Sequence, residues 1–489
     1  MPETQTPAPE PSCRPSPTGW PTLVREHFNG ATSAQAAARA SLRAEFGLPI
    51  DRPVVLSGHQ PGLWHPGILA KRFALTALAE RTNAGSAWLV VDHDADDAGV
   101  LRIPVRTPGH PGGIDARAIR LAPDDAARPL GLRPAIADLS AMEDAIERGL
   151  GELIPGRLEA IADALRAHAG AASLADQLAR TGEDLLPPEE PRVTLLSSLA
   201  LGRTTLFQEL VEKMRAEPEA CRGSYNGAIE GVGPGPGIRA LAPGEFPLWI
   251  LRDNRRLPAT GERLRGLGER DALAPRGLLM TGLVRFGACD LFIHGTGGGG
   301  SGANQPGYDR VTERWLEAWL GWARLAPAVV ATATVLLEFP GPSPPIPTEA
   351  DLARARWRAH HAAHDPAMLG DGPLAERKRA HVRAIEAAAD PGERATRFRA
   401  MHELLAENRR AHASALAELR ATAERLQRER EASGLRADRA WSFALHPPRA
   451  LSALRVRTGR AFEGASGGVP TRAARYAQPG VAPGGSSDA

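Results

Sequence analysis

The sequence predicts an α/β protein in which helices cover both faces of a parallel sheet, followed by a C-terminal helical domain. Residues 53–57 and 87–91 are short, largely apolar runs of strand length, as expected for strands buried on both faces. Residues 68–81 between them carry apolar side chains in a helical pattern, so these segments form a βαβ unit. From residue 349 to 431 the chain is almost entirely Ala, Arg, Glu, Leu and His, which favours long helices.

The remaining elements of the core follow from the same periodicity. Helical patterns are present at 34–46, 135–178, 197–216 and 308–322. Apolar runs of strand length are present at 101–105, 246–251, 290–293 and 329–339. The Gly/Pro-rich stretch 231–237 predicts a loop, and the proline-rich stretch 340–347 predicts the end of the core.

Composition divides the chain into consecutive parts. Residues 1–20 are rich in proline and polar residues and are expected to form a flexible tail, and residues 466–489 a disordered one. Between the tails we expect an α/β core over 21–345, with helical insertions at about 130–220. A helical hairpin or coiled coil over 346–435 follows, and then a return segment over 436–465 that packs on the core.

The helical domain carries a seam of regularly spaced, mostly apolar positions. Its positions are separated by seven, four, three, four and three residues, and they are Leu405, His412, Leu416, Leu419, Ala423 and Leu426. This spacing is typical of a helical hairpin or a coiled coil with charged flanks. A break at 390–392 predicts two long helices. The seam suits either a homodimer through this domain or packing within one chain.

Composition also excludes several classes of protein. No apolar run approaches the roughly 18 residues of a membrane-spanning helix, and residues 1–21 lack the apolar core of a secretory signal. Three cysteines (Cys13, Cys221 and Cys289) show neither metal-ligand nor disulfide spacing, as in a reducing cytoplasm. The net charge of +2 does not indicate a nucleic-acid partner. We therefore expect a cytoplasmic protein with no nucleic-acid or membrane partner.

The first candidate site is the loop after the first strand. His59 and His65 lie six residues apart, and Lys71 follows one turn into the next helix. In open α/β sheets ligands bind outside the carboxyl ends of the strands, where a helix N-terminus offers N–H groups and partial positive charge to phosphate. We predict His59 as a catalytic residue, and as nucleotide- or substrate-binding residues Gly58, Gln60, Gly62, His65 and Lys71. The alternative is a tight turn of ordinary loop residues.

The second candidate site is the acidic turn after the second strand, Asp92-His93-Asp94-Ala95-Asp96-Asp97. Carboxylates this close repel one another unless a cation, an arginine or a substrate amine is present. The turn therefore suits recognition of an amine or a ribose, general-base work, or Mg²⁺ binding. We predict His93 and Asp94 as catalytic and Asp92 and Asp97 as substrate-binding, with no metal ligand assigned. The alternative is a solvated acidic turn.

The third candidate site joins a strand, a glycine loop and a helix at residues 292–309. In this setting a glycine loop can cradle an anion, whereas glycine runs elsewhere also serve as flexible linkers. Its predicted binding residues are His294, Gly295, Gly297, Gly298, Tyr308 and Asp309. The helical domain adds His360, His361 and His364 at helical spacing, which we interpret as a solvated face.

These motifs carry a family resemblance. Residues 54–71, with Gly-His-Gln, Gly-Leu, Pro-Gly and a lysine in the next helix, resemble the opening motif of the bacillithiol biosynthesis cysteine-adding enzyme family, which reads Gly-Gln-Gln, Gly-Leu and Gly-Pro. Residues 88–97 are similar to that family's strand ending in an acidic-His-Asp motif, and residues 275–309 to its late core segment. The resemblance covers most of the chain in order, through short motifs.

The resemblance implies a Rossmann-like core of the nucleotidyltransferase type and an α-helical coiled-coil dimerisation domain. It implies a ligase that adds cysteine, or another amino acid, to an amino-sugar acceptor (glucosaminyl-malate in the family), with a cleft for a nucleotide such as ATP or ADP. Two features depart from the family: His59 stands where it has glutamine, and residues 301–306 expand the glycine loop. His59 with His65 also resembles the paired histidines of class I nucleotidyltransferases.

Two other functions remain open from the sequence. The chain could be a non-catalytic dimeric binding or scaffold protein that keeps the fold, or a transferase that acts on sugar nucleotides. A single polar cleft that joins residues 58–71, 92–97 and 294–300 favours an enzyme, and dispersal of these segments over the surface favours a scaffold.

Overall fold

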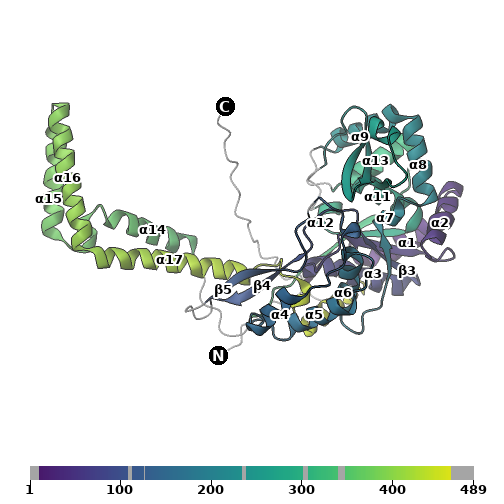
Figure 1. Ribbon diagram of the computed structural model, residues 1–489, viewed down its shortest axis with the longest axis horizontal. Helices are drawn as coiled ribbons and strands as arrows, with labels where there is room; N and C mark the ends of the chain where they lie inside the picture. The colour runs from purple at the N-terminus through teal and green to yellow at the C-terminus, as the bar shows by residue number, and fades with distance from the viewer. Residues whose placement is uncertain are drawn as a thin grey trace.

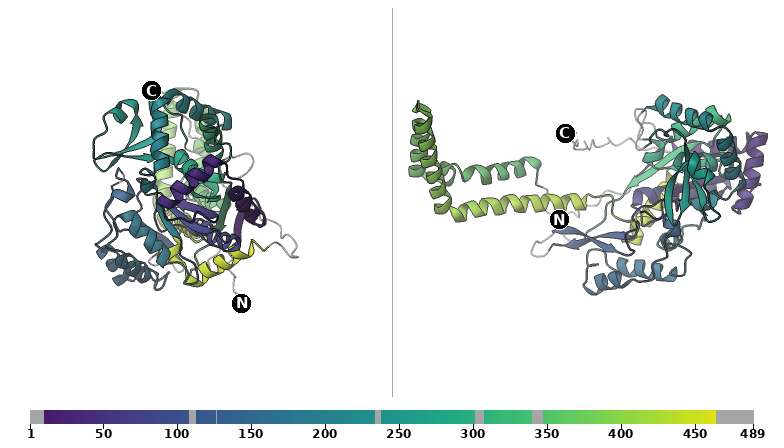
Figure 2. Two further views of the ribbon diagram at one scale, coloured as in Figure 1. Left: turned by 90° about the vertical axis from the view of Figure 1, so that its right-hand side faces the viewer. Right: turned by 45° about the horizontal axis from the view of Figure 1, so that its top comes forward.

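The computed structural model has an α/β body and a helical arm (Figure 1). It describes residues 10–107, 113–125, 127–233, 238–300, 307–339 and 347–463. The body comprises the described residues up to 339 together with 437–463, and the arm comprises residues 349–436. Figure 2 shows that the arm projects well away from the body. Among the described residues, no helix is both long and apolar enough to cross a bilayer.

A six-stranded sheet forms the centre of the body. Its order is β1 (Glu10–Arg14), β11 (Ala328–Thr334), β10 (Leu291–His294), β2 (Val54–His59), β3 (Gly85–Val90) and β6 (Thr194–Ser197). All neighbours are parallel except β1, which pairs antiparallel with β11. The predicted α/β class with a parallel sheet is confirmed, with the correction that an antiparallel edge strand makes the sheet mixed. The chain builds outwards from β2 to β6 and then returns to β10 on the other side of β2.

Helices cover both faces of this sheet. Along β2, Val55 faces one apolar cluster while Val54 and Leu56 face the other, because successive strand side chains point to opposite faces. On the first face lie α1 (Trp20–Asn29), α3 (Pro66–Thr82) and α18 (Pro448–Arg460). On the second lie α2 (Ser33–Glu45), α8 (Thr205–Ala216), α9 (Pro218–Val232), α11 (Gly277–Leu283) and α13 (Asp309–Leu320). Burial on both faces explains the continuous apolar runs of the sequence.

Two further layers flank the sheet. After β3 the chain forms the antiparallel pair β4 (Val100–Arg106) and β5 (Ile114–Arg120), and then α4 (Ser140–Glu147), α5 (Arg157–Ala167) and α6 (Leu174–Asp184). After β6 come the short α7 (Ser198–Leu201) and a three-stranded antiparallel sheet of order β8 (Arg255–Thr260), β7 (Glu245–Arg252) and β9 (Ala272–Pro275). Short helices α10 (Gly261–Arg265) and α12 (Thr296–Gly299) complete the body. The small sheet carries one wall of the cavity described below.

The arm consists of α14 (Glu349–Ala362), α15 (Gly372–Ala387), α16 (Pro391–Ala411) and α17 (Ala413–Arg436). α14 lies along α17 and α15 along α16, and the two pairs meet at a bend (Figure 1). After α17 the chain returns to the body, where Phe443, Leu451 and Leu454 pack against Leu69 and Phe73 of α3.

Several predictions are wrong in detail. The flexible tail predicted over residues 1–20 is wrong for 10–20, because β1 pairs with the exposed edge of β11 and Trp20 is fully buried. The seam from 405 to 426 is not continuous, because the helix ends at Ala411 and His412 bonds Asp371 instead. Residues 231–232 end α9 rather than belonging to a loop, whereas residues 234–237, 301–306 and 466–489 lie outside the described residues.

Candidate active site

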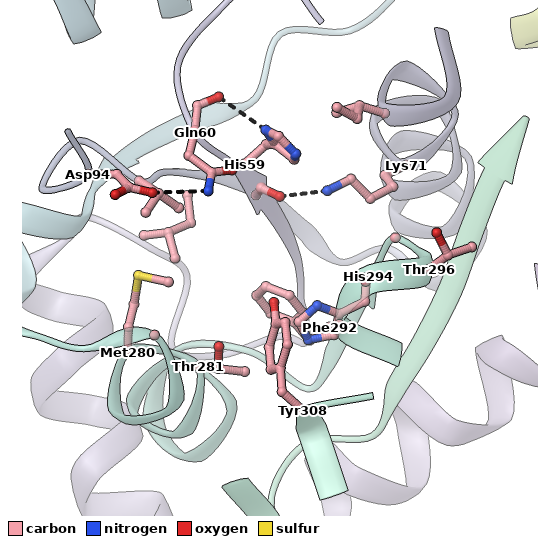
Figure 3. Close-up of a pocket in the computed structure, with 18 of the residues that line it drawn as sticks. His59, Gln60, Lys71, Asp94, Met280, Thr281, Phe292, His294, Thr296 and Tyr308 are labelled. Carbon is pink, nitrogen blue, oxygen red and sulfur yellow. Dashed lines mark hydrogen bonds between the residues drawn. The ribbon is translucent and has the colours of Figure 1, made fainter. Parts of the chain in front are cut away.

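A cavity of about 560 Å³ opens at the carboxyl ends of β2, β3 and β10. It lies where the strand order reverses between β2 and β10, the place where ligands bind in open parallel sheets. Figure 3 shows His59, Gln60 and Lys71 on one side of the cavity, facing Met280, Thr281 and Tyr308 on the other. The predicted site residues that line it are Gly58, His59, Gln60, His65, Lys71, His93, Asp94, His294, Gly295, Gly297, Gly298 and Tyr308.

Four predicted residues do not line this cavity. Asp92 directs both carboxylate oxygens away from it, towards Ser197, Ser198 and the backbone N–H of Leu199. Gly62 lies in the loop before α3, and Asp97 pairs with Arg120 at the surface. Asp309 pairs with Arg285 and His294 beneath the cavity. A sequence motif places these residues near a site but does not determine which way each side chain points.

His65 caps the helix that begins behind the first strand. Its Nδ1 accepts a hydrogen bond from the Gly67 N–H at 3.1 Å, and its carbonyl accepts one from Ile68 at 3.0 Å. The expectation of free N–H groups for phosphate at this helix N-terminus is therefore wrong, because His65 already satisfies them. With Nδ1 acting as an acceptor, the neutral His65 ring carries its proton on Nε2. Burial, aided by Arg439 and Lys71, lowers the pKa of His65.

Lys71 is a buried amine on the cavity wall. Its Nζ donates to the Gly58 carbonyl at 2.7 Å and lies 5.4 Å from the centre of the Trp88 ring. Burial lowers the pKa of Lys71 to about 7. An amine that is bonded to a carbonyl and only partly protonated at neutral pH is a poor permanent anchor for phosphate. Lys71 is better suited to exchange a proton.

His59 is an uncharged imidazole at neutral pH. Burial, with Lys71 nearby, lowers its pKa to about 3. Its Nδ1 lies 3.3 Å from the Gln60 carbonyl oxygen, which can only accept, so Nδ1 carries the proton and Nε2 keeps a lone pair. Trp64 packs edge-on against the ring, with the centroids 6.0 Å apart.

Asp94 is the carboxylate that faces the cavity. It accepts hydrogen bonds from Gln60 Nε2 at 3.1 Å and from Arg256 Nη1 at 2.6 Å. Burial alone would raise the pKa of Asp94, but the bonds from Gln60 and Arg256 outweigh it and hold the pKa below the usual range. Asp94 is therefore ionised at neutral pH. Its bond from Gln60 joins the loop after β2 to the acidic turn after β3.

The glycine loop after β10 is tightly packed. A Cβ on Gly298 would lie 2.3 Å from His294 Nδ1, and one on Gly299 would lie 2.1 Å from a Val330 methyl. Only glycine fits these two positions, so residues 298 and 299 are closely packed against their neighbours, whereas a side chain at Gly297 would meet nothing within 4 Å. His294 Nε2 lies 2.9 Å from the Asp309 carboxylate, and Tyr308 packs edge-on to the His294 ring.

No protein-family model and no curated protein matches this chain. Within the described residues, no group of three or more His, Cys, Asp or Glu side chains is placed to hold a metal ion.

The cavity wall formed by the small sheet was not predicted from the sequence. It includes Trp249 of β7 and Arg256 of β8, whose guanidinium lies 4.5 Å from the centre of the Trp249 ring. Asp253 and Asn254 join these strands with φ of 50° and 60°, and an Asp-Asn pair between two apolar or basic runs is a recognisable hairpin signal. A second hollow of about 420 Å³ adjoins this wall and shares Trp249, Gly277 and Tyr308 with the cavity.

Proposed function

We propose that this chain is an enzyme of the carbon–nitrogen ligase class, which brings the amino group of one small molecule to the carboxyl group of another. The observation that carries the proposal is that three chain segments, 58–71, 92–97 and 294–300, contribute to one cavity of about 560 Å³. This volume lies within the range of roughly 300–1,000 Å³ that is usual for small-molecule sites. A scaffold protein has no need for such a convergence of ionisable side chains.

The charges in the cavity suit an amine and an acid. The ionised Asp94 is a partner for a substrate ammonium, and its bonds to Gln60 and Arg256 keep it in place. An ammonium must lose a proton before its nitrogen can attack a carbonyl carbon, and Lys71, whose pKa is lowered to about 7, is suited to take it. The uncharged His59 and His93 can accept the second proton as the carbon–nitrogen bond forms. Arg439, in the body just after the end of α17, and the Nε2–H of His65 supply donors for an anionic group.

The finer part of the proposal rests on the resemblance described above. In it the core is Rossmann-like, the acceptor is an amino sugar and the added amino acid is cysteine. The order of the parallel strands, β11-β10-β2-β3-β6, supports a Rossmann-like core because it reverses beside the first strand. A transferase that acts on sugar nucleotides shares these features, and the test below includes nucleotides for that reason.

A nucleotide such as ATP or ADP fits this site only in part. Arg439 and His65 would hold its phosphates, and the adjoining hollow beside Trp249 offers room for its base. Bound there, the nucleotide would supply a phosphoryl or nucleotidyl group to activate a carboxylate. Any Mg²⁺ would have to bind mainly through the phosphates, since the described residues provide no metal cage of their own.

The arm is the proposed homodimer contact. Its two helix pairs bury only small apolar clusters, one around Leu404 and Leu405 and the other around Ala362 and Leu416. Trp357 of α14 remains 53% exposed and Phe398 of α16 remains 42% exposed. A second copy that covered these side chains would add apolar burial that the arm lacks on its own.

Calorimetric titration of the full-length protein with cysteine, ATP and ADP tests the proposal. We expect cysteine to bind, and Asp94→Asn to weaken it at least about tenfold, since an ion pair in a partly desolvated site contributes a kcal/mol or more. Asp97→Asn is the matched control, because Asp97 belongs to the same acidic turn but pairs with Arg120 outside the cavity. If none of the three ligands binds, or both variants weaken binding equally, the ligase proposal is rejected.

A further inference from the structure

We infer that Ser198 and Asp92 hold His93 in a single tautomer, with the proton on Nδ1, so that His93 Nε2 is presented to the cavity as a proton acceptor. Ser198 and its neighbour Ser197 lie outside the motifs that follow the first two strands. The inference deepens the proposed function. The tautomer of His93 does not depend on that function, but the identity of the substrate proton that His93 accepts does. Ser198 and Asp92 are then positioning residues, and His93 is the group that meets the substrate.

The sheet brings these residues together. β3 and β6 are parallel neighbours, with Val90 opposite Ser197, so the residues that follow both strands lie at the same edge. Ser197 caps α7, with its Oγ accepting from the Ala200 N–H at 3.1 Å, and Ser198 is the first residue of that helix. The serines consequently sit directly beside Asp92 and His93, about a hundred residues away in the chain.

The contacts form a chain from a carboxylate to an imidazole. Ser198 Oγ lies 2.8 Å from Asp92 Oδ1 and 2.6 Å from His93 Nδ1, and all three side chains are buried. The second carboxylate oxygen of Asp92 accepts from Ser197 Oγ at 2.5 Å, and the Leu199 N–H donates to the first at 2.8 Å.

The protons available to Asp92, Ser198 and His93 determine which atom donates in each of these hydrogen bonds. Burial raises the pKa of Asp92, and the bonds from Ser197, Leu199 and Ser198 oppose that shift. Both serine oxygens already accept a backbone N–H, Ser197 from Ala200 and Ser198 from His93, so we assign both hydroxyl protons to an ionised Asp92. Ser198 has one hydroxyl proton and donates it to the carboxylate, because a bond to a charged acceptor is stronger than one to a neutral ring. The Ser198 oxygen must then accept from His93, which places the His93 proton on Nδ1 and the lone pair on Nε2.

The surroundings keep this ring uncharged until a proton arrives. Burial lowers the pKa of His93 to about 4, with Asp94 opposing the shift and Arg256 adding to it. These two side chains, together with Asp92 through Ser198, are the charged groups around the ring. In the proposed reaction Nε2 would take the proton that the amine nitrogen gives up as it bonds to the carboxyl carbon, since that nitrogen is far more acidic than a free ammonium. The imidazolium formed would then donate from Nδ1 towards Ser198, where the Asp92 charge stabilises it.

Nuclear magnetic resonance of the full-length protein tests the tautomer without any substrate. The histidines are labelled with the NMR-active nitrogen isotope, and the His93→Gln variant identifies the His93 signals by their loss. At neutral pH we expect His93 Nδ1 to give the shift of a protonated ring nitrogen and Nε2 that of a bare one. In Ser198→Ala the ring should lose its single tautomer and show a mixture.

Ser197→Ala is the matched control, because Ser197 also bonds Asp92 and caps α7 but does not touch His93. It should lose stability and keep the His93 tautomer. A wild-type His93 with its proton on Nε2 overturns the inference, as does an unchanged tautomer in Ser198→Ala. If Ser198→Ala does not fold, the wild-type spectrum still decides. Because no ligand is added, failure of the ligase proposal in calorimetry leaves the tautomer result intact. A wrong tautomer likewise leaves the binding of cysteine, ATP and ADP untouched.

Discussion

The body and the arm use the same charged residues in opposite ways. In the body, Arg72 is buried and its guanidinium donates to both Glu183 and Glu190. In the arm, Arg377 and Glu407 are paired while their side chains remain 57% and 46% exposed. A buried charge that loses its partner costs several kcal/mol, whereas an exposed pair contributes little. The comparison therefore predicts that substitutions of the buried charged residues of the body unfold it, whereas those of exposed pairs such as Arg377 and Glu407 change stability little.

The two regions also differ in which contacts determine their structure. The arm is built from contacts along and between neighbouring helices, so sequence periodicity predicts that it is helical, although it did not predict the break at His412. The body is built from contacts between distant segments, and its cavity exists only where three strand ends meet. Ionisable groups with a chemical task lie in the second kind of region, because burial there changes their pKa values.

Removing Asp290 should have the largest effect. This carboxylate is 0% exposed and accepts from Arg43 Nη2 at 2.6 Å and from the Val54 N–H at 2.9 Å, with Arg39 2.8 Å away. Asp290→Ala leaves buried cations unpaired, so we expect the free energy of unfolding to fall by about 3–5 kcal/mol, or the body not to fold. Urea denaturation followed by tryptophan fluorescence measures it. A loss below about 1 kcal/mol would mean that the ion pairs of Asp290 contribute no more than the exposed ion pairs of the arm.

Acid should weaken the body through buried histidines. His446 is 1% exposed, neither ring nitrogen has a hydrogen-bond partner among the described residues, and burial lowers its pKa to about 4. Below its ordinary pKa of about 6.5 the unfolded chain takes up a proton that the folded chain refuses, so the contribution is complete above pH 6.5 and is lost as pH falls towards 4.

The effect of His446 alone should reach at most about 3 kcal/mol. His59 and His93, whose pKa values are lowered to about 3 and about 4, act in the same direction. The test is the slope of unfolding free energy between pH 4 and 7, with His446→Leu expected to make it shallower. An identical slope in this variant would show that His446 is not the group that titrates.

Glycine substitutions should have opposite signs in the two regions. Gly298→Ala in the body forces a Cβ against His294, and we expect a loss of about 1–3 kcal/mol. Gly434→Ala in α17 meets nothing within 4 Å and should stabilise the arm by about 0.5–1 kcal/mol, because glycine is a poor helix former. Thermal unfolding of both variants gives the two signs, and a destabilised Gly434→Ala would reveal a packed surface on the arm.

Local elements could be predicted from the sequence, whereas contacts between distant segments could not. β2, α3 and β3 were predicted to within two residues, since apolar runs and a helical period encode them locally. The candidate turns were also found, because the ends of parallel strands share one edge. Arg256 was missed, since it reaches the cavity through the packing of a separate small sheet. The bond from the Gly67 N–H to His65 Nδ1 was missed as well, so free N–H groups were expected at a helix start that His65 caps. Side-chain direction depends on contacts that one sequence does not display.

The smallest effect is expected from Arg377 in the arm. Two parallel hydrogen bonds, of 2.9 and 3.0 Å, join its guanidinium to Glu407 across α15 and α16. Water competes for both side chains, and holding them in one geometry costs conformational entropy. Arg377→Ala should therefore lower the unfolding free energy by less than about 1 kcal/mol.

A double-mutant cycle with Glu407→Ala isolates the pair, and circular dichroism follows the helices. The coupling energy should shrink further as salt is added, because screening acts on exposed charges. A coupling of several kcal/mol that resists salt would mean that this pair is desolvated in solution. A second copy of the arm lying across it would have that effect, so the measurement that compares the two regions also examines the proposed dimer contact.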